Sequence, residues 1–291
     1  MRVNPADRTK SISEYYFSAK LKEIRELNEK GASIINLGIG NPDMNPPLSV
    51  TEKLISSAIS DSANGYQHYR GIMQLREAFS RWYLEKFGVK LSPDSEILPL
   101  IGSKEGIMHI SLAFLNRGDG VLLPDPGYPA YEAVARICNA RPVFYNLAEE
   151  NGWYPDLEAI EREGLDGVKL MWVNYPNMPT GSKGSVKLFK ELVEFGIKHN
   201  ILIVNDNPYS FILNENPVSI FSAPGSMEIA LELNSLSKSH NMAGWRVGVV
   251  SGNSDYIEAV LRIKSNMDSG MFLPVQLAAS EALSVGEKWY E

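Results

Sequence analysis

The feature that most restricts the fold of this chain is an alternation of short apolar runs with helical patterns, which begins near residue 97. Most of the runs are continuously apolar, as is typical of strands buried on both faces of a sheet. Helical patterns lie between several of them, at 103–115, 129–139 and 185–199. This alternation predicts an α/β domain with a mainly parallel central sheet, arranged as a three-layer sandwich. The apolar runs are Ile97–Ile101, Gly120–Leu123, Pro142–Tyr145, Val168–Val173, Ile201–Val204, Ala230–Leu233 and Val247–Val250.

The segment before residue 97 predicts three helices and one short strand. From Ser13 to Lys30, apolar residues recur at helical spacing on one face. A short strand is expected at Ile34–Leu37, and it leads into a loop at Gly38–Asp43. The two further helices are expected at 47–60 and 72–87.

Composition and charge exclude several classes of protein. The chain of 291 residues is 44% hydrophobic and 22% charged, which is ordinary for a globular protein. A net charge of -7 and a pI near 5.3 argue against a nucleic-acid partner, since such a surface needs a basic footprint. No apolar run reaches about 18 residues and the first residues lack the apolar core of a signal peptide, so we expect a cytoplasmic protein without a membrane span.

Cysteine and histidine usage predicts neither disulfides nor a metal site. Cys138 is the one cysteine and lies in an apolar helical stretch, where a buried, inert thiol is expected. The histidines never fall three to five positions apart and have no cysteine partners, so no metal site is expected. They are His68, His109, His199 and His240.

Two predicted strands end in groups of polar residues, at the edge of a parallel sheet where ligands bind. The run Ile201–Val204 leads into Asn205-Asp206-Asn207-Pro208-Tyr209. By itself, an aspartate in this place is as often a turn or cap residue as a functional one. The run Ala230–Leu233 leads into a segment in which Lys238 lies between serines and Arg246 follows eight positions later. A solvated basic loop would carry more charge and less glycine, tryptophan and valine.

This second segment, Ser235–Gly248, resembles the lysine signature of fold-type I pyridoxal-phosphate enzymes, specifically of the class I/II aminotransferases. The resemblance extends from about Ile35 to the end of the chain. It implies the aminotransferase large-domain fold and pyridoxal 5'-phosphate as cofactor. It also implies transfer of an amino group between an amino acid and a 2-oxo acid, and a homodimer.

The resemblance assigns a role to each matching residue around the lysine. Lys238 would hold the cofactor as a Schiff base, the internal aldimine, and would carry the proton between the substrate Cα and the cofactor. Asp206 would pair with the pyridine nitrogen and keep it protonated, which makes the ring an electron acceptor. Tyr209 would donate its phenol to the 3' oxygen, and Arg246 would clamp the phosphate in a bidentate manner. The hydroxyl groups expected on the same phosphate are those of Ser235 and Ser237.

Two upstream segments gain a meaning only through the resemblance. Leu100–Gly106 is a strand that enters a helix through a glycine, which by itself is most simply an ordinary helix start. Matched to the family, Ser103 and Lys104 would bind the phosphate, chiefly through backbone N–H groups. In Asp125–Tyr131, Tyr128 would stack on the pyridine ring, although a core aromatic residue is a fair alternative.

Two further residues are expected at the borders of the site. Gly40, in the loop Gly38–Asp43, would border the substrate with its backbone. Tyr66 matches the tyrosine that reaches the cofactor phosphate of the partner subunit, so the active unit would be a dimer.

The sequence departs from the family pattern in Asn174–Gly181. The asparagine that bonds the cofactor's 3' oxygen in the family falls at Met178, and a thioether cannot donate a hydrogen bond. Asn177 is adjacent, but neighbours in an extended segment point to opposite sides. The Met178–Pro179 bond is expected to be cis, as in the family.

The end of the chain is the second departure. Lys288–Glu291 lies in what resembles the helix that leads into the C-terminal small domain, which in the family carries the arginine for the substrate α-carboxylate. The expected organisation is an N-terminal arm and helix belonging to the small domain, 1–46, and a cofactor-binding large domain, 47–291, that ends in the interdomain helix. The C-terminal part of the small domain would be absent.

Other functions share the lysine signature. A β-eliminating carbon–sulfur lyase, a decarboxylase or a cyclopropane-forming synthase would use the same cofactor residues. A non-enzymatic sensor built on this fold ranks lower, because such regulators carry an N-terminal DNA-binding domain and only some 30 residues precede the loop at Gly38.

Overall fold

The computed structural model describes residues 3–12, 14–38 and 40–290. Its centre is a seven-stranded sheet in the order β1-β7-β6-β5-β4-β2-β3. The strands from β2 to β6 pair in parallel, and β7 runs antiparallel to both of its neighbours. The mainly parallel sheet predicted from the apolar runs is therefore confirmed. The strands are β1 Ile97–Leu100, β2 Gly120–Asp125, β3 Arg141–Asn146, β4 Val168–Val173, β5 Leu202–Asp206, β6 Ala230–Ser235 and β7 Gly248–Gly252.

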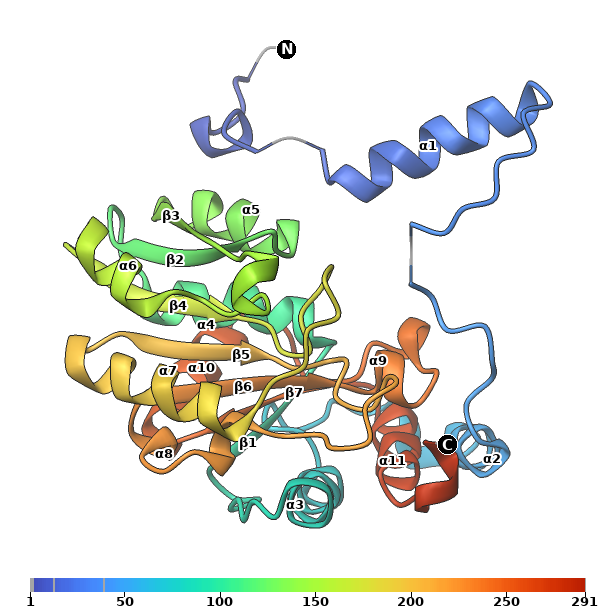
Figure 1. Ribbon diagram of the computed structural model, residues 1–291. Helices are drawn as coiled ribbons and strands as arrows, with labels where there is room; N and C mark the ends of the chain where they lie inside the picture. Colours follow the sequence, from blue (N-terminus) through green and yellow to red (C-terminus); the bar gives the residue numbers. More distant parts are fainter. Residues whose placement is uncertain (1–2, 13, 39, 291) are drawn as a thin grey trace.

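Helices cover both faces of this sheet (Figure 1). The α-helices are α1 Tyr16–Glu29, α2 Leu48–Ala58, α3 Met73–Phe87, α4 Ser103–Phe114, α5 Pro129–Ile137, α6 Leu157–Glu163, α7 Val186–His199, α8 Ser226–Ile229, α9 Leu236–Ser239, α10 Ser254–Lys264 and α11 Leu273–Ala282. Short 3-10 helices are η1 Asp7–Thr9, η2 Asp61–Asn64, η3 Glu149–Asn151, η4 Ile220–Ser222, η5 Ala243–Trp245 and η6 Glu287–Trp289. Within the described ranges, no helix has the length and apolar character needed to cross a membrane.

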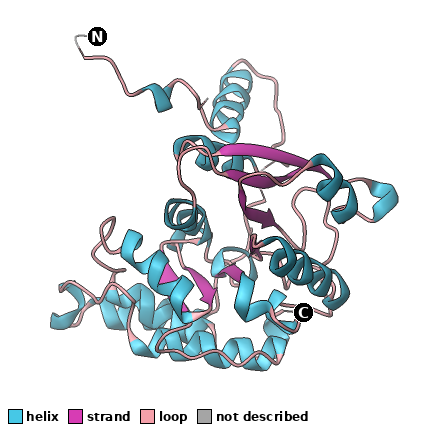
Figure 2. Cartoon of the chain, turned by 90° about the vertical axis from the view of Figure 1, so that its left-hand side faces the viewer, coloured by secondary structure: helices cyan, strands magenta, loops and turns pink. Residues whose placement is uncertain are grey.

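The two faces of β4 show why its sequence is apolar throughout. Leu170 and Trp172 belong to one core, which α4, α5 and α10 complete, whereas Met171 and Val173 belong to a second core completed by α7. Successive side chains of a strand point to opposite faces, so a strand covered on both faces needs apolar residues at every position. Figure 2, turned by 90°, shows helices on both sides of the strands. The three-layer sandwich is confirmed.

A third core joins α2, α3 and α11 to the β1–β7 edge of the sheet. Trp82 of α3 is buried there with its ring centroid 5.3 Å from those of Phe87 and Phe211, and the buried ring of Tyr83 lies 5.4 Å from that of Phe87. The same core includes Leu236, which begins the short helix α9. Packing on this side therefore holds the backbone of α9 at the end of β6.

The N-terminal part departs from the sequence expectation. Helix α1 forms as predicted, but it stands apart from the layered body and none of its residues is buried (Figure 1). Ser13, the expected start of this helix, lies outside the described residues. The strand expected at Ile34–Leu37 is wrong: the segment has no strand partner, and Ile35 and Leu37 are 83% and 90% exposed. A strand is stabilised by hydrogen bonds to a neighbour, and apolar spacing alone does not supply one.

Candidate active site

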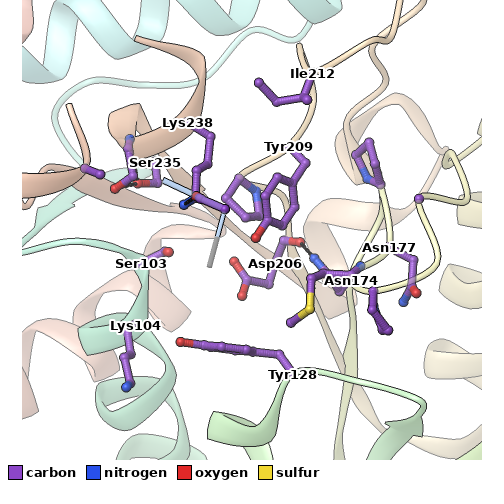
Figure 3. A pocket seen from close by; sticks show the side chains of 18 of the residues that line it. Ser103, Lys104, Tyr128, Asn174, Asn177, Asp206, Tyr209, Ile212, Ser235 and Lys238 are labelled. Carbon is purple, nitrogen blue, oxygen red and sulfur yellow. Dashed lines mark hydrogen bonds between the residues drawn. The ribbon is translucent and has the colours of Figure 1, made fainter. Parts of the chain in front are cut away.

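A cavity of about 740 Å³ opens where β4, β5 and β6 end. Each of these strands delivers polar residues to the cavity at or just beyond its last residue, because parallel strands end at the same edge of the sheet (Figure 3). All residues expected at the site line this cavity, with the exception of Tyr66. They are Gly40, Ser103, Lys104, Tyr128, Asp206, Tyr209, Ser235, Ser237, Lys238 and Arg246.

Asp206 is the last residue of β5, and its carboxylate is buried at the floor of the cavity. The phenol of Tyr131 donates to Oδ2 at 2.9 Å, while Oδ1 has no hydrogen-bond partner among the described residues. Burial raises the pKa of Asp206 to about 6, although the Tyr131 bond opposes this rise. The ring of Tyr131 is held by stacking on Trp172, with centroids 5.1 Å apart. The site therefore contains a carboxylate oxygen that is open to a donor from a ligand.

Lys238 lies in α9, directly after β6, and its side chain reaches into the cavity (Figure 3). Its Nζ donates a hydrogen bond to the carbonyl oxygen of Gly40. Burial lowers the pKa of Lys238, and the positive charge of Arg246 lowers it further. A lysine whose charged form is disfavoured in this way is more readily available as a nucleophile and base.

The turn before Lys238 is fixed by serine hydroxyls. Ser235 caps α9, because its Oγ accepts a bond of 3.1 Å from the backbone N–H of Ser237. Its own hydroxyl lies 2.8 Å from Oγ of Ser237 and donates to it. Both hydroxyl groups line the cavity and can turn toward an anion there.

Two glycines, Gly102 and Gly248, let the backbone near Arg246 pack closely against the start of α4. Gly102 precedes α4 with φ 82°, and a Cβ at this position would lie 2.2 Å from Nη2 of Arg246. A Cβ on Gly248 would lie 2.6 Å from the backbone nitrogen of Ser103. A side chain at Gly102 would thus collide with the guanidinium, and a side chain at Gly248 would collide with the backbone at the helix start. This arrangement of a guanidinium, hydroxyls and a helix N-terminus suits a phosphate group.

Aromatic side chains form another wall of the cavity. Tyr128 lines it opposite Asp206 and Tyr209 (Figure 3), and burial raises the pKa of the Tyr128 phenol. The hydroxyl of Tyr15 donates to the hydroxyl of Tyr128 at 3.1 Å. The Nζ of Lys104 lies 3.7 Å from the centroid of the Tyr15 ring, a cation–π contact. The N-terminal arm therefore contributes Tyr15 to the site as well as Gly40, and the sequence did not predict the contribution of Tyr15.

The segment around Met178 is held by a neighbouring asparagine. Asn174 Oδ1 accepts a bond of 2.7 Å from the backbone N–H of Met178, and its Nδ2 donates to the carbonyl oxygen of Asp206. The Met178–Pro179 bond is cis, as predicted. Asn177 was expected to point away from the site, because neighbours in an extended segment point to opposite sides. Instead, Met178 and Asn177 both line the cavity. Asn177 Oδ1 accepts from the Thr180 hydroxyl at 2.8 Å, and its buried Nδ2 has no partner among the described residues.

Tyr66 and Cys138 lie away from this cavity. Tyr66 is 93% exposed and is not among the lining residues. Cys138 is half-buried rather than fully buried, and burial raises the pKa of its thiol, which disfavours the reactive thiolate. Sequence reasoning also missed several lining residues, for which no local motif exists: Tyr15, Phe17, Tyr131, Asn174 and Ile212.

One group of metal-binding residue types exists elsewhere in the described part of the chain. Ligand atoms of Glu105, His109 and Asp268 lie within 4.8 Å of one another. Asp268 also accepts a bond of 2.8 Å from the buried ammonium of Lys264, and His109 Nε2 lies 2.9 Å from Glu105. The fixed positive charge of Lys264 makes this group an ion-pair cluster between α4 and α10. Sequence spacing could not reveal it, since Asp268 lies far along the chain from Glu105 and His109.

Comparison with known proteins places this architecture in a family. The sequence profile described as aminotransferase class I and II matches residues 32–289. The LL-diaminopimelate aminotransferase of Dehalococcoides mccartyi is 42% identical over 279 residues, which cover 95% of this chain and 72% of that protein. The enzyme of the same name from Moorella thermoacetica is 43% identical and is covered to 73%, with 97% of this chain.

Solved structures agree with these relatives. Substrate-bound BacF from Bacillus subtilis superposes with a TM-score of 0.94 at 35% identity, covering 100% of this chain and 74% of BacF. The aspartate aminotransferase from Thermus thermophilus with maleate gives a TM-score of 0.90 at 26% identity, covering 97% of this chain and 73% of that one. The chain thus spans about three quarters of the length of the proteins that it matches. It belongs to the class I and II aminotransferase family, and it is an aminotransferase.

Proposed function

We propose that the cavity binds pyridoxal 5'-phosphate and that Lys238 holds this cofactor through a covalent bond from its Nζ. The observation that carries the proposal is the convergence of three unlike partners in one cavity. These are a lysine with a lowered pKa, a buried carboxylate with one free oxygen, and an anion site formed by the Arg246 guanidinium, the hydroxyls of Ser235 and Ser237 and the start of α4. A pyridinium ring with an aldehyde and a phosphate presents the matching groups.

The residues present fit this cofactor. The unpartnered Oδ1 of Asp206 suits a protonated ring nitrogen, which would also favour the ionised form of a carboxylate whose pKa is now raised by burial. Arg246 and the N–H groups at the start of α4 suit the phosphate, together with the hydroxyls of Ser235 and Ser237. The bound cofactor supplies an electron-accepting ring that takes up and gives back an amino group.

The protein's own residues hold and move protons around that ring. Lys238 would take the proton from the substrate Cα, and its lowered pKa suits that task. Asp206 would keep the ring nitrogen protonated, and Tyr209 would donate to the ring's 3' oxygen. Tyr128 would lie against the flat face of the ring, and its bond with Tyr15 fixes its phenol end.

The assembly and the domain organisation belong to the same proposal. The high exposure of Tyr66 suits a residue that reaches the phosphate of a partner subunit in a homodimer. The separation of α1 from the layered body supports an N-terminal arm at 1–46 beside a large domain at 47–291. A single cysteine, Cys138, is consistent with a reducing cytoplasm.

The fate of the amino group tests the proposed chemistry. The protein would be saturated with pyridoxal phosphate and incubated with an amino acid labelled with ¹⁵N and an unlabelled 2-oxo acid. The label should appear in the amino acid formed from the 2-oxo acid, with little free ammonium. Release of labelled ammonium together with pyruvate would instead indicate β-elimination and would contradict transamination.

A further inference from the structure

We infer that Lys264 is a positioning residue for the cofactor site of the partner subunit. Lys264 fixes the segment Gly65–Ile72, and this segment presents Tyr66 to the phosphate that the other chain binds. The inference rests on the proposed function, because it requires a homodimer in which Tyr66 crosses between subunits. It adds a buried residue outside the cavity lining to those that determine cofactor affinity.

The segment Gly65–Ile72 contains neither helix nor strand, so its backbone groups need partners from other parts of the chain. Nζ of Lys264, at the end of α10, donates to the carbonyl oxygen of Tyr69 at 3.2 Å. Oε1 of Gln276, on α11, accepts from the last N–H of the segment at 2.8 Å. Both side chains are buried, whereas Tyr66 at the other end of the segment is 93% exposed. Interior side chains thus fix the segment from which Tyr66 projects.

The loop after α10 packs directly against this segment. A Cβ at Gly270 would lie 2.8 Å from the carbonyl oxygen of Gln67, the residue after Tyr66, so the two backbones are in close contact there. The N–H of Gly270 donates to Oδ1 of Asp268 at 2.8 Å, and the ammonium of Lys264 donates to the same oxygen at 2.8 Å. One carboxylate therefore joins the loop that touches the segment to the lysine that holds it.

The same carboxylate connects this arrangement to α4, the helix whose first residues form the phosphate site. Ligand atoms of Asp268, Glu105 and His109 lie within 4.8 Å of one another. Glu105 also accepts a hydrogen bond from the backbone N–H of Ile101, just before the helix. In a two-fold dimer each chain presents its own Tyr66 and receives the partner's at α4. The position of the segment relative to α4 therefore determines whether both sites are completed.

The contribution of this cluster is geometry more than stability. The side chain of Lys264 is 1% exposed, and taking two charges out of water offsets most of their attraction. Oδ2 of Asp268 and Nδ1 of His109 are both buried without a hydrogen-bond partner among the described residues. A buried pair that leaves polar atoms unsatisfied is a weak source of stability. Its directional bonds nevertheless hold the segment in one place.

Affinity for pyridoxal phosphate, measured from the absorbance band of the covalently bound cofactor, tests the inference. Tyr66→Phe should weaken binding by roughly 10-fold, since a hydrogen bond to a phosphate is charge-assisted. Lys264→Met is combined with Asp268→Asn, so that no charge of the pair is left buried and unpaired. This double variant should weaken binding to a similar degree, and adding Tyr66→Phe to it should cause little further loss. Lys198→Met, which removes the lysine of an ion pair on α7, is the control and should not change the affinity.

Mixed dimers show which subunit is affected. Two affinity tags allow dimers of two different chains to be purified, and Lys238→Ala removes the covalent site of the chain that carries it. With Lys264→Met and Asp268→Asn in that same chain, the remaining site receives Tyr66 from the altered segment and should bind about 10-fold more weakly. With both substitutions in the other chain, the remaining site receives Tyr66 from an unaltered segment. It should then bind as in a dimer that carries Lys238→Ala alone.

Gly270→Ala is an independent variant that removes no charge. Its Cβ would meet the carbonyl oxygen of Gln67 at 2.8 Å, and the backbone φ of 88° adds strain, so the segment must shift. In mixed dimers it should give the same pattern as the double variant. Gly286→Ala should give no such pattern, because a Cβ there meets no atom within 4 Å and φ is -72°.

The outcomes separate the two proposals. Weaker binding only when the substitutions lie in the chain that holds the cofactor would overturn the inference, because Lys264 would then act on α4 of its own chain. Fully additive losses with Tyr66→Phe would overturn it as well. A monomeric protein, or unchanged affinity in Tyr66→Phe, would also overturn it and would leave the role of Lys238 intact. If the wild-type protein bound no cofactor covalently, the proposed function would fail together with this inference.

Discussion

The phenol of Tyr131 donates a hydrogen bond of 2.9 Å to Oδ2 of Asp206, and Oδ1 of the same carboxylate is buried without a partner among the described residues. Half of this carboxylate is thus fixed by the protein and the other half is left for a ligand. An unsatisfied buried carboxylate costs stability in the cofactor-free protein. The site is arranged for binding at the expense of the stability of the empty chain.

The loss of stability caused by the buried Asp206 carboxylate should depend on pH, and the raised pKa of this group sets the direction. Burial raises that pKa from 3.8 to about 6, so the folded state holds the proton more tightly than the unfolded state. The free energy of unfolding therefore falls as pH rises from about 4 to about 6. Asp206→Asn should stabilise the cofactor-free protein above pH 6 by up to about 3 kcal/mol, and should have little effect below pH 4.

Urea unfolding of the cofactor-free protein at pH 4 and pH 8 measures this difference. Asp166→Asn, at an exposed aspartate outside the cavity lining, is the control and should show no such pH dependence. A difference between wild type and Asp206→Asn that is the same at both pH values would show that burial of the charge is not what the substitution relieves.

The close packing of Gly248 against the start of α4 predicts a contrast between two glycines of one motif. A Cβ at Gly248 would lie 2.6 Å from the backbone nitrogen of Ser103 and 2.7 Å from the carbonyl carbon of Gly102, so the loop must move. Gly248→Ala should weaken the binding of pyridoxal phosphate by roughly 10-fold or more. Gly244→Ala should not, because a Cβ there meets no atom within 4 Å. Equal affinities for both variants, measured by absorbance titration, would argue against a phosphate site at the start of α4.

Met178 gives a spectroscopic prediction. Met178→Asn places a hydrogen-bond donor in the segment that lines the cavity beside Asn174. An added donor favours the anionic form of the cofactor's ring oxygen. The pKa at which the absorbance of the bound cofactor changes should then fall by about one unit, since a bond to a charged group contributes roughly 1.5 kcal/mol. Met178→Leu, which adds no donor, should leave this pKa in place. No shift in the asparagine variant would mean that another group already supplies the donor.

The body of the fold could be predicted from sequence because its strands are buried on both faces. The run Val168–Val173 coincides with β4, and the other runs overlap the remaining strands. The strand predicted at Ile34–Leu37 was wrong because this segment is not buried. Its apolar residues face solvent in the described chain, and nothing in a local pattern distinguishes such a segment from a strand.

The site was predictable where its residues lie in a continuous motif. Ser235, Ser237, Lys238 and Arg246 fall within one stretch of the chain, and all of them line the cavity. Tyr131 was missed because its hydrogen bond to Asp206 joins positions 75 residues apart. In addition, a tyrosine in an amphipathic helix is most simply interpreted as a core residue. Contacts of this kind arise from tertiary packing and leave no spacing to detect.

The most direct test of the proposed site is reduction of the bound cofactor with borohydride, followed by mass spectrometry of the peptides. The wild-type protein should carry the reduced pyridoxyl phosphate adduct on Lys238 and lose its visible absorbance band. Lys238→Ala should retain noncovalent affinity through Asp206 and Arg246 but should yield no adduct at that peptide. An adduct on another lysine in the wild type, or trapping of the cofactor by Lys238→Ala in wild-type yield, would contradict the central role of Lys238.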